Sequence, residues 1–266
     1  MTGIICNLCK DRIANQRNSH ILPGFLKKDY LKTTSRFFHS IIIGTRKLKI
    51  EQDLPKEDFI FCSHCENRFN TIETIISKHL SNSYQILQTK SYPKFRMLEY
   101  EYQLFKNCNP KVFTLFVYSL IWRMHISNHP VFEDFVLPEN CAEDLRKTLH
   151  NFLTEKTSEL NKSLETLKHQ RWDFIFIKPE HHPRGFSNIN FNENISKKKI
   201  SFIIIWEYII VFPLNNSSIP KFLENYLNRN FKETRIIIFK NKTWNETSTK
   251  LGQIVMSNYE SEPIKL

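Results

Sequence analysis

Four of the six cysteines fall into two pairs of identical spacing, and this feature constrains the fold more than any other. Cys6 and Cys9 form the first pair, and Cys62 and Cys65 form the second. Two residues between thiolates allow both sulfur atoms to face inward from a tight turn, as a tetrahedral zinc ion requires. Two such pairs complete a four-thiolate site, so the sequence predicts a structural Zn²⁺. Chance spacing and a thioredoxin-like redox pair are the alternatives, but two matched pairs are much more specific than one.

The chain carries no recognisable export or membrane segment. Its most apolar stretch, residues 200–214, is interrupted by Glu207 and is shorter than the roughly 20 residues that a membrane-spanning helix needs. The N-terminus places cysteines where a signal peptide has its apolar core. We therefore expect a cytoplasmic protein, in which Cys108 and Cys141 are buried thiols rather than disulfide partners.

Positive charge is concentrated near the N-terminus. The formal net charge is +11, and the first 50 residues carry ten basic and two acidic side chains, which accounts for +8 of it. A basic segment favours an anionic partner such as nucleic acid, although a run of charge is also typical of an ordinary solvated surface. The chain has five glycines and no Gly-x-Gly or Gly-x4-Gly-Lys segment, which excludes Rossmann and P-loop nucleotide sites.

Apolar periodicity predicts helices in the middle of the chain. Apolar residues recur at helical spacing within residues 113–124 and again within 142–167, so we expect one buried helix and one or two helices that cover it. Trp122 and Arg123 lie beside the apolar stripe of the first helix. An ion pair with a neighbouring helix and a contact with phosphate are the two roles open to Arg123.

Strand-like runs follow in the last third of the chain. They are short, rich in β-branched and aromatic residues, and lie at 174–177, 200–212 and 235–239. A polar loop is expected over 179–199 and a helix over 220–230. The sequence thus predicts an α+β fold of three units: a treble-clef zinc module over 1–80, a helical region over 81–168 and a small α+β unit over 169–266.

The residues around the cysteine pairs add a second pattern. His20 is followed three residues later by Pro23, and Glu66 comes directly after the second pair. A first cysteine pair, a His-x-x-Pro segment and a second cysteine pair follow one another in residues 1–80. With these features in this order, the segment resembles HNH, or ββα-metal, nucleases, which belong to the treble-clef group of zinc folds. The chain also resembles uncharacterised bacterial proteins that share a Ser-His-x-x-Pro-x-Phe segment, a Cys-x2-Cys-Glu segment and a later Trp-Arg pair.

The nuclease resemblance implies a metal-dependent reaction on a phosphodiester. His20 would be the general base that activates water, with Glu66 and Asn70 near a catalytic Mg²⁺ or Mn²⁺. On a helix both residues share a face with Glu73, which suits ligation by hard oxygen atoms. That face also fits the solvent side of an amphipathic helix, and His20 also fits a neighbour of the zinc ligands or a surface residue. At Ser19 the chain departs from the family, which usually has a metal-binding Asp, Glu or His there.

We therefore expect a zinc-stabilised protein that acts on nucleic acid as a DNA endonuclease, in bacterial antiphage defence by family analogy. Basic residues between the cysteine pairs would contact the phosphate backbone: Lys27, Lys28, Arg36, Arg46, Lys47 and Lys49. The alternative is a non-catalytic zinc module that binds nucleic acid or a partner protein encoded beside it. A membrane partner is not expected.

Overall fold

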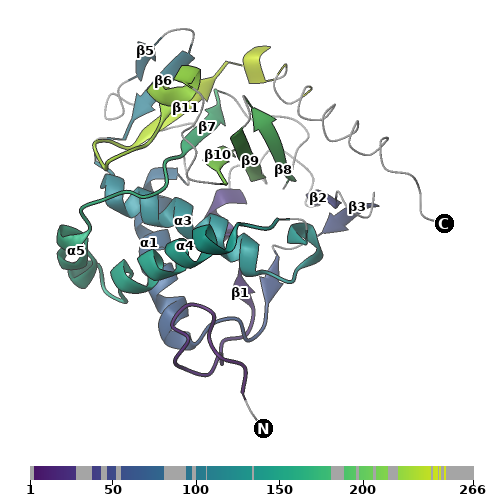
Figure 1. Ribbon diagram of the computed structural model, residues 1–266, viewed down its shortest axis with the longest axis vertical. Helices are drawn as coiled ribbons and strands as arrows, with labels where there is room; N and C mark the ends of the chain where they lie inside the picture. Colours follow the sequence, from purple (N-terminus) through teal and green to yellow (C-terminus); the bar gives the residue numbers. More distant parts are fainter. Residues whose placement is uncertain are drawn as a thin grey trace.

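The computed structural model combines helices with one large sheet and confirms an α+β fold (Figure 1). It describes residues 3–27, 38–42, 47–51, 55–80, 94–97, 100–105, 107–133, 135–180, 189–195, 198–205, 208–214 and 221–240, with 242–244, 246 and 249. Within these residues, no helix is both long enough and apolar enough to cross a bilayer.

The cysteine-bearing part of the chain is a set of short strands followed by one long helix. Strand β1 pairs antiparallel with β4, and β2 pairs antiparallel with β3. The elements are β1 (Ser19–His20), η1 (Gly24–Lys27), β2 (Phe38–Ile42), β3 (Lys47–Glu51), β4 (Lys56–Glu57) and α1 (Ser63–Leu80). Helix α1 begins inside the second cysteine pair, where the Asn15 side chain accepts the Ser63 backbone N–H at 2.9 Å. This bond satisfies one of the free N–H groups that every helix start presents.

Helix α3 (Pro110–Ile126) is the central element of the helical part. It begins with an Asn109 cap and a proline in its first turn, the order that favours a helix start. Every residue from Val112 to Met124 is buried, so Trp122 and Arg123 are enclosed rather than set beside a single apolar stripe. The predicted covering helices are two: α4 (Glu139–Phe152) and α5 (Thr157–Thr166), after the short η3 (Pro130–Phe132).

A mixed seven-stranded sheet forms the second layer. Its order is β5-β6-β11-β7-β10-β9-β8, with β7 and β11 parallel and the other neighbours antiparallel. The strands are β5 (Lys94–Met97), β6 (Tyr100–Leu104), β7 (Ile175–Pro179), β8 (Ile189–Ile195), β9 (Lys198–Ile205), β10 (Tyr208–Pro213) and β11 (Arg235–Phe239). A 3₁₀ segment, η4 (Lys221–Tyr226), stands where a longer helix was expected.

The strand predictions are confirmed at β7 and β11, but the sheet also contains three strands, β5, β6 and β8, in segments predicted to be helix or loop. The apolar run at 200–212 forms two strands of a hairpin, and β8 lies within the segment expected to be a loop. Strands β5 and β6 come from the region expected to be helical. Residues 181–188, with the tandem histidines, lie outside the described residues.

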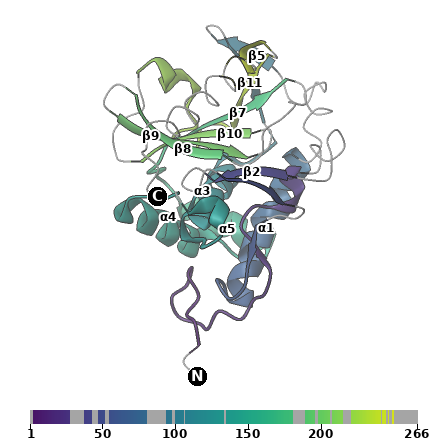
Figure 2. The same ribbon diagram turned by 90° about the vertical axis from the view of Figure 1, so that its right-hand side faces the viewer.

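Helices α1, α3, α4 and α5 lie together on one side of the sheet, and the N-terminal loop lies beyond them (Figures 1 and 2). The Phe113 ring on α3 packs against Phe174 and Phe176, with centroids 5.9 and 5.2 Å apart. The Tyr118 hydroxyl donates a hydrogen bond to the Trp172 backbone carbonyl at 2.6 Å and accepts one from the Trp172 backbone N–H at 3.0 Å. One hydrophobic cluster of buried residues runs from the cysteines through α3 into the sheet.

Candidate metal centre and the buried arginine beside it

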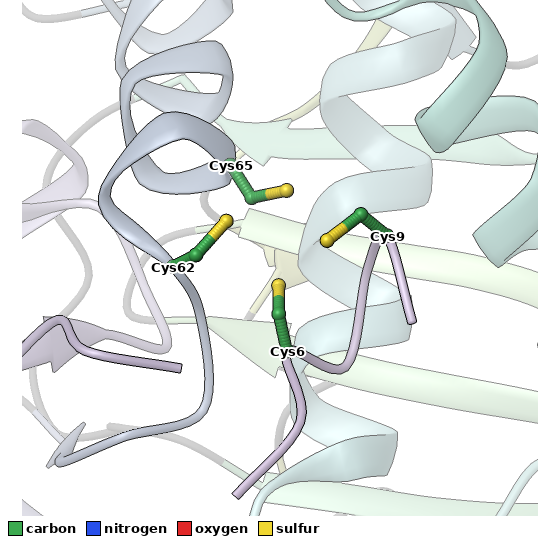
Figure 3. A group of neighbouring side chains, drawn as sticks. All are labelled: Cys6, Cys9, Cys62 and Cys65. Carbon is green, nitrogen blue, oxygen red and sulfur yellow. The ribbon is translucent and has the colours of Figure 1, made fainter. Parts of the chain in front are cut away.

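The four paired cysteines meet in one place. Their Sγ atoms all lie within 4.8 Å of one another and point inward from the N-terminal loop and from the start of α1 (Figure 3). Residues 6–10, here called the zinc knuckle, turn tightly, with Lys10 N–H bonded to the Cys6 carbonyl at 3.0 Å and Lys10 at φ 57°. The predicted four-cysteine cluster is confirmed as a group that can hold a metal ion.

The electrostatics of the cluster suit a cation such as Zn²⁺. A hydrogen bond with the Cys65 thiol lowers the pKa of Cys6 to about 4, and the same bond, aided by burial, raises the pKa of Cys65. Burial also raises the pKa of Cys62. Without a cation the buried thiols share protons instead of all ionising, whereas a bound Zn²⁺ stabilises four thiolates and displaces those protons.

Arg146 on α4 fixes the zinc knuckle from outside. Its Nη1 donates to the Leu8 carbonyl at 2.7 Å, while Nε and Nη2 each lie 2.7 Å from a Glu143 carboxylate oxygen. The hydrogen bond from Arg146 lowers the pKa of Glu143 to about 2. The sequence gives no local signal for this contact because Arg146 and Leu8 lie 138 positions apart.

Ser19 and His20 occupy β1, which faces α1 and α3. Ser19 is fully buried and His20 is half-buried, as the alternation of side chains along a strand requires. The His20 carbonyl accepts a hydrogen bond from Arg123 Nη1 at 2.9 Å. The backbone of the predicted general base is thus held by a residue that follows it by 103 positions.

Arg123 is buried between β1 and α1, with 2% of its side chain exposed. Its Nη2 lies 2.7 Å from Glu73 Oε1, and its guanidinium lies over the Phe69 ring, 5.0 Å from the centroid. Its Nε donates to the Ser119 carbonyl at 3.3 Å. Of the two roles open to Arg123, the ion pair with a neighbouring helix is confirmed.

The three polar residues that share a face of α1 have different surroundings. Glu66 is half-buried, and burial raises the pKa of its carboxyl, with Arg123 and the nearby Ser19 hydroxyl favouring the ionised form. Glu73 pairs with Arg123, whereas Asn70 is exposed. The structure therefore brings Ser19, Glu66 and Glu73 together around the guanidinium and leaves Asn70 at the surface.

The predicted phosphate-contacting residues are only partly placed. Lys27 ends η1, and Lys47 and Lys49 lie at alternate positions of β3. The other three, Lys28, Arg36 and Arg46, lie outside the described residues.

No protein-family model, curated protein or solved structure matches this chain.

Proposed function

We propose that this chain is a zinc-stabilised nucleic-acid-binding protein, built on a treble-clef module of the HNH type that does not use that module for catalysis. The order of parts supports the treble clef: a cysteine knuckle, a paired strand carrying His20, and a helix that starts at the second cysteine pair. In this proposal the zinc ion stabilises the fold and takes no part in a reaction.

The position of Arg123 carries the non-catalytic part of the proposal. HNH nucleases hold a divalent metal between the strand with the general base and the following helix. In this chain a guanidinium lies there instead, bonded to the His20 carbonyl at 2.9 Å and 2.7 Å from Glu73. A fixed positive charge supplies the carboxylates with the compensation that a metal would give, and it repels a divalent cation at short range.

The donor set supports the same proposal. Mg²⁺ prefers several oxygen ligands, usually including one or two carboxylates, in near-octahedral geometry. Around Arg123, the side-chain oxygen atoms that the structure describes as available to a metal belong to the Glu66 carboxylate and the Ser19 hydroxyl, while Glu73 already pairs with the guanidinium. Asn70, the third oxygen donor expected on α1, is exposed.

The charge distribution supports nucleic acid as the partner. The first 50 residues carry +8 of the net +11, and three of their lysines lie on η1 and β3, next to β1 or in the hairpin that follows it. Binding of this kind depends on phosphate neutralisation, so it should tolerate sequence changes and weaken steeply with salt.

A metal-dependent nuclease is the second candidate, favoured by one observation. Glu66 lies beside Ser19, so an acidic side chain comes close to the residue just before His20, where the nuclease family places a metal ligand. In that case His20 would activate water, and Glu66 would hold Mg²⁺ or Mn²⁺.

One assay separates the two candidates. Zinc-loaded wild type and His20→Ala are mixed with labelled duplex DNA, single-stranded DNA and RNA, first without and then with Mg²⁺ or Mn²⁺. We expect both proteins to bind nucleic acid with equal affinity, and this affinity should fall as the salt concentration rises. Neither protein should cleave the nucleic acid when Mg²⁺ or Mn²⁺ is added. Cleavage that His20→Ala abolishes would establish the nuclease instead, and an absence of binding to all three nucleic acids would refute both candidates.

A further inference from the structure

A pocket of about 420 Å³ opens between the zinc knuckle and the helices. Lys10 forms the wall on the knuckle side, and the other walls come from the end of α3, the segment before α4 and the first two turns of α4. Its apolar lining consists of Trp122, Ile126, Leu137 and Ala142. Small-molecule sites in proteins commonly have this size and a mostly apolar lining with a few placed polar groups.

The charged side chains of this pocket nearly balance. Arg146 and Glu143 neutralise each other through two contacts of 2.7 Å. Lys10 adds a positive charge, and its ammonium lies 3.3 Å from Asn7 Oδ1, an uncharged partner. Glu139 adds a negative charge from the first turn of α4. The pocket therefore offers one cationic end and one acidic group rather than a field of a single sign.

His125 gives the pocket a neutral polar wall. Its Nδ1 accepts the Leu137 backbone N–H at 3.1 Å, so the proton of the neutral ring is on Nε2. Burial lowers the pKa of His125, which keeps the ring neutral near pH 7. The ring also forms a hydrogen bond with the Phe135 backbone, so it adds a fixed, uncharged polar group to the pocket wall.

These features together select a class of ligand. A simple anion would leave the apolar wall uncovered, and a hydrocarbon would remove Lys10 from water without replacing its hydrogen bonds. A ligand that fits has a flat apolar body, neutral donors and acceptors at its edge, and one negative group.

We propose that this pocket binds a single nucleotide, an inference that rests on the proposed function. The base lies against the apolar wall, its edge and the sugar hydroxyls meet Glu139, and the phosphate lies at Lys10. The nucleotide comes either from the end of a bound strand or from free mononucleotide. The zinc knuckle then acts as one wall of a recognition site as well as a fold-stabilising element.

Calorimetric titration of the zinc-loaded full chain tests this inference. The probes are AMP, adenosine, a short single-stranded DNA and the same strand circularised. We expect AMP to bind more tightly than adenosine because of the phosphate contact. A linear strand that binds more tightly than the circle identifies a strand end as the source, whereas equal binding of the two, with AMP bound, identifies the free nucleotide.

Two variants and one control locate the binding. Lys10→Glu should weaken AMP about tenfold and remove its advantage over adenosine, because the charge at the phosphate is reversed. Ala142→Phe should weaken both ligands by about tenfold or more by filling the apolar wall. Lys156→Glu makes the same charge change at a residue that is 74% exposed and outside the pocket. It should leave the affinities for AMP and for adenosine unchanged.

The outcomes separate this inference from the proposed function. Strand binding without AMP binding, or AMP binding that neither variant alters, would overturn the pocket assignment and leave the proposed function standing. AMP binding that depends on Lys10, in a protein that binds no polymer, would keep the pocket and overturn the proposed function. Should Ala142→Phe fail to fold, Lys10→Glu decides alone because Lys10 is exposed.

Discussion

Arg123 joins three parts of the molecule through one side chain. It donates to the His20 carbonyl on β1, pairs with Glu73 on α1 and stacks on Phe69. A charge this deeply buried is stable only while its partners are present, because an uncompensated buried ion is costly to desolvate. The residue therefore ties the position of β1 to that of α1.

Replacing Arg123 should be strongly destabilising. Arg123→Met keeps the length of the side chain but removes two hydrogen bonds of the buried guanidinium, to the His20 and Ser119 carbonyls, together with the counter-charge of the half-buried Glu73, which costs about 3–5 kcal/mol. Urea unfolding of the zinc-loaded protein measures this loss. The control is Arg171→Met, which breaks a 2.7 Å pair with Asp144 at a residue that is 59% exposed, and should cost less than about 1 kcal/mol. Equal losses in the two variants would contradict a special role for Arg123.

His125 should make stability depend on pH in the neutral range. Burial lowers the pKa of His125 below its usual 6.5, so the folded state binds fewer protons there than the unfolded state. The contribution of His125 is fully present above pH 6.5 and is lost as the pH falls toward the folded-state pKa. His125→Asn keeps an acceptor for the Leu137 N–H but does not titrate. As the pH falls from 7.5 to 5.5, wild type should therefore lose free energy of unfolding relative to His125→Asn. Parallel curves for the two proteins would contradict this.

Among the elements, those with a local apolar pattern could be predicted from the sequence. Helices α1 and α3 carry enough apolar residues at helical spacing, and β7 and β11 are short apolar runs, so burial dictates each of them locally. Strand β6 reads Tyr-Glu-Tyr-Gln-Leu, which is only half apolar. It pairs locally with β5 on one edge, and on the other edge it pairs with β11, about 130 positions later. Pairing over such distances leaves no mark in a local window.

The candidate site divides in the same way. The cysteine spacing is a local property of the chain, and it predicted the cluster correctly. The contacts of Arg123 with β1 and of Arg146 with the zinc knuckle span 103 and 138 positions, so only the packing of α3 and α4 creates them. The sequence offered the ion pair of Arg123 as one of two roles, and it gave no indication of Arg146.

The contact between α4 and the zinc knuckle predicts an effect on metal retention. Arg146→Met removes the donor to the Leu8 carbonyl, so the knuckle backbone should hold the ligands less rigidly and zinc affinity should fall about 10-fold or more. Competition with a colorimetric chelator measures this. Lys147→Met, at the next position of α4 and 63% exposed, is the matched control and should leave affinity unchanged. Unchanged affinity in Arg146→Met would show that the knuckle is rigid without α4.

On the scale of the whole molecule, α3 lies between the cysteine-bearing part of the chain and the sheet, which also touch directly where the Tyr208 hydroxyl on β10 donates to the Leu80 carbonyl of α1 at 3.4 Å. On one side Trp122 packs on Phe61 and Phe69, with ring centroids 5.9 and 6.4 Å away, and on the other Phe113 packs on the sheet. A helix buried on all sides cannot keep its position if either neighbour unfolds, because its apolar surface would meet water. The zinc module, the helices and the sheet should consequently unfold together.

Zinc removal tests this cooperativity and the predicted unit boundaries at once. A structural zinc site contributes on the order of 10 kcal/mol, comparable with the roughly 5–15 kcal/mol that stabilises a whole domain, so chelation should unfold the chain. Hydrogen exchange should then lose protection even at β10, where Phe212 packs on Trp172 with centroids 5.8 Å apart, remote in sequence from the cysteines. Cys62→Ser should reproduce this loss, whereas Cys108→Ala, which removes a buried thiol outside the cluster, should retain zinc and protection. If residues 169–266 formed an independent unit, β10 would stay protected in the zinc-free chain, which would contradict cooperative unfolding.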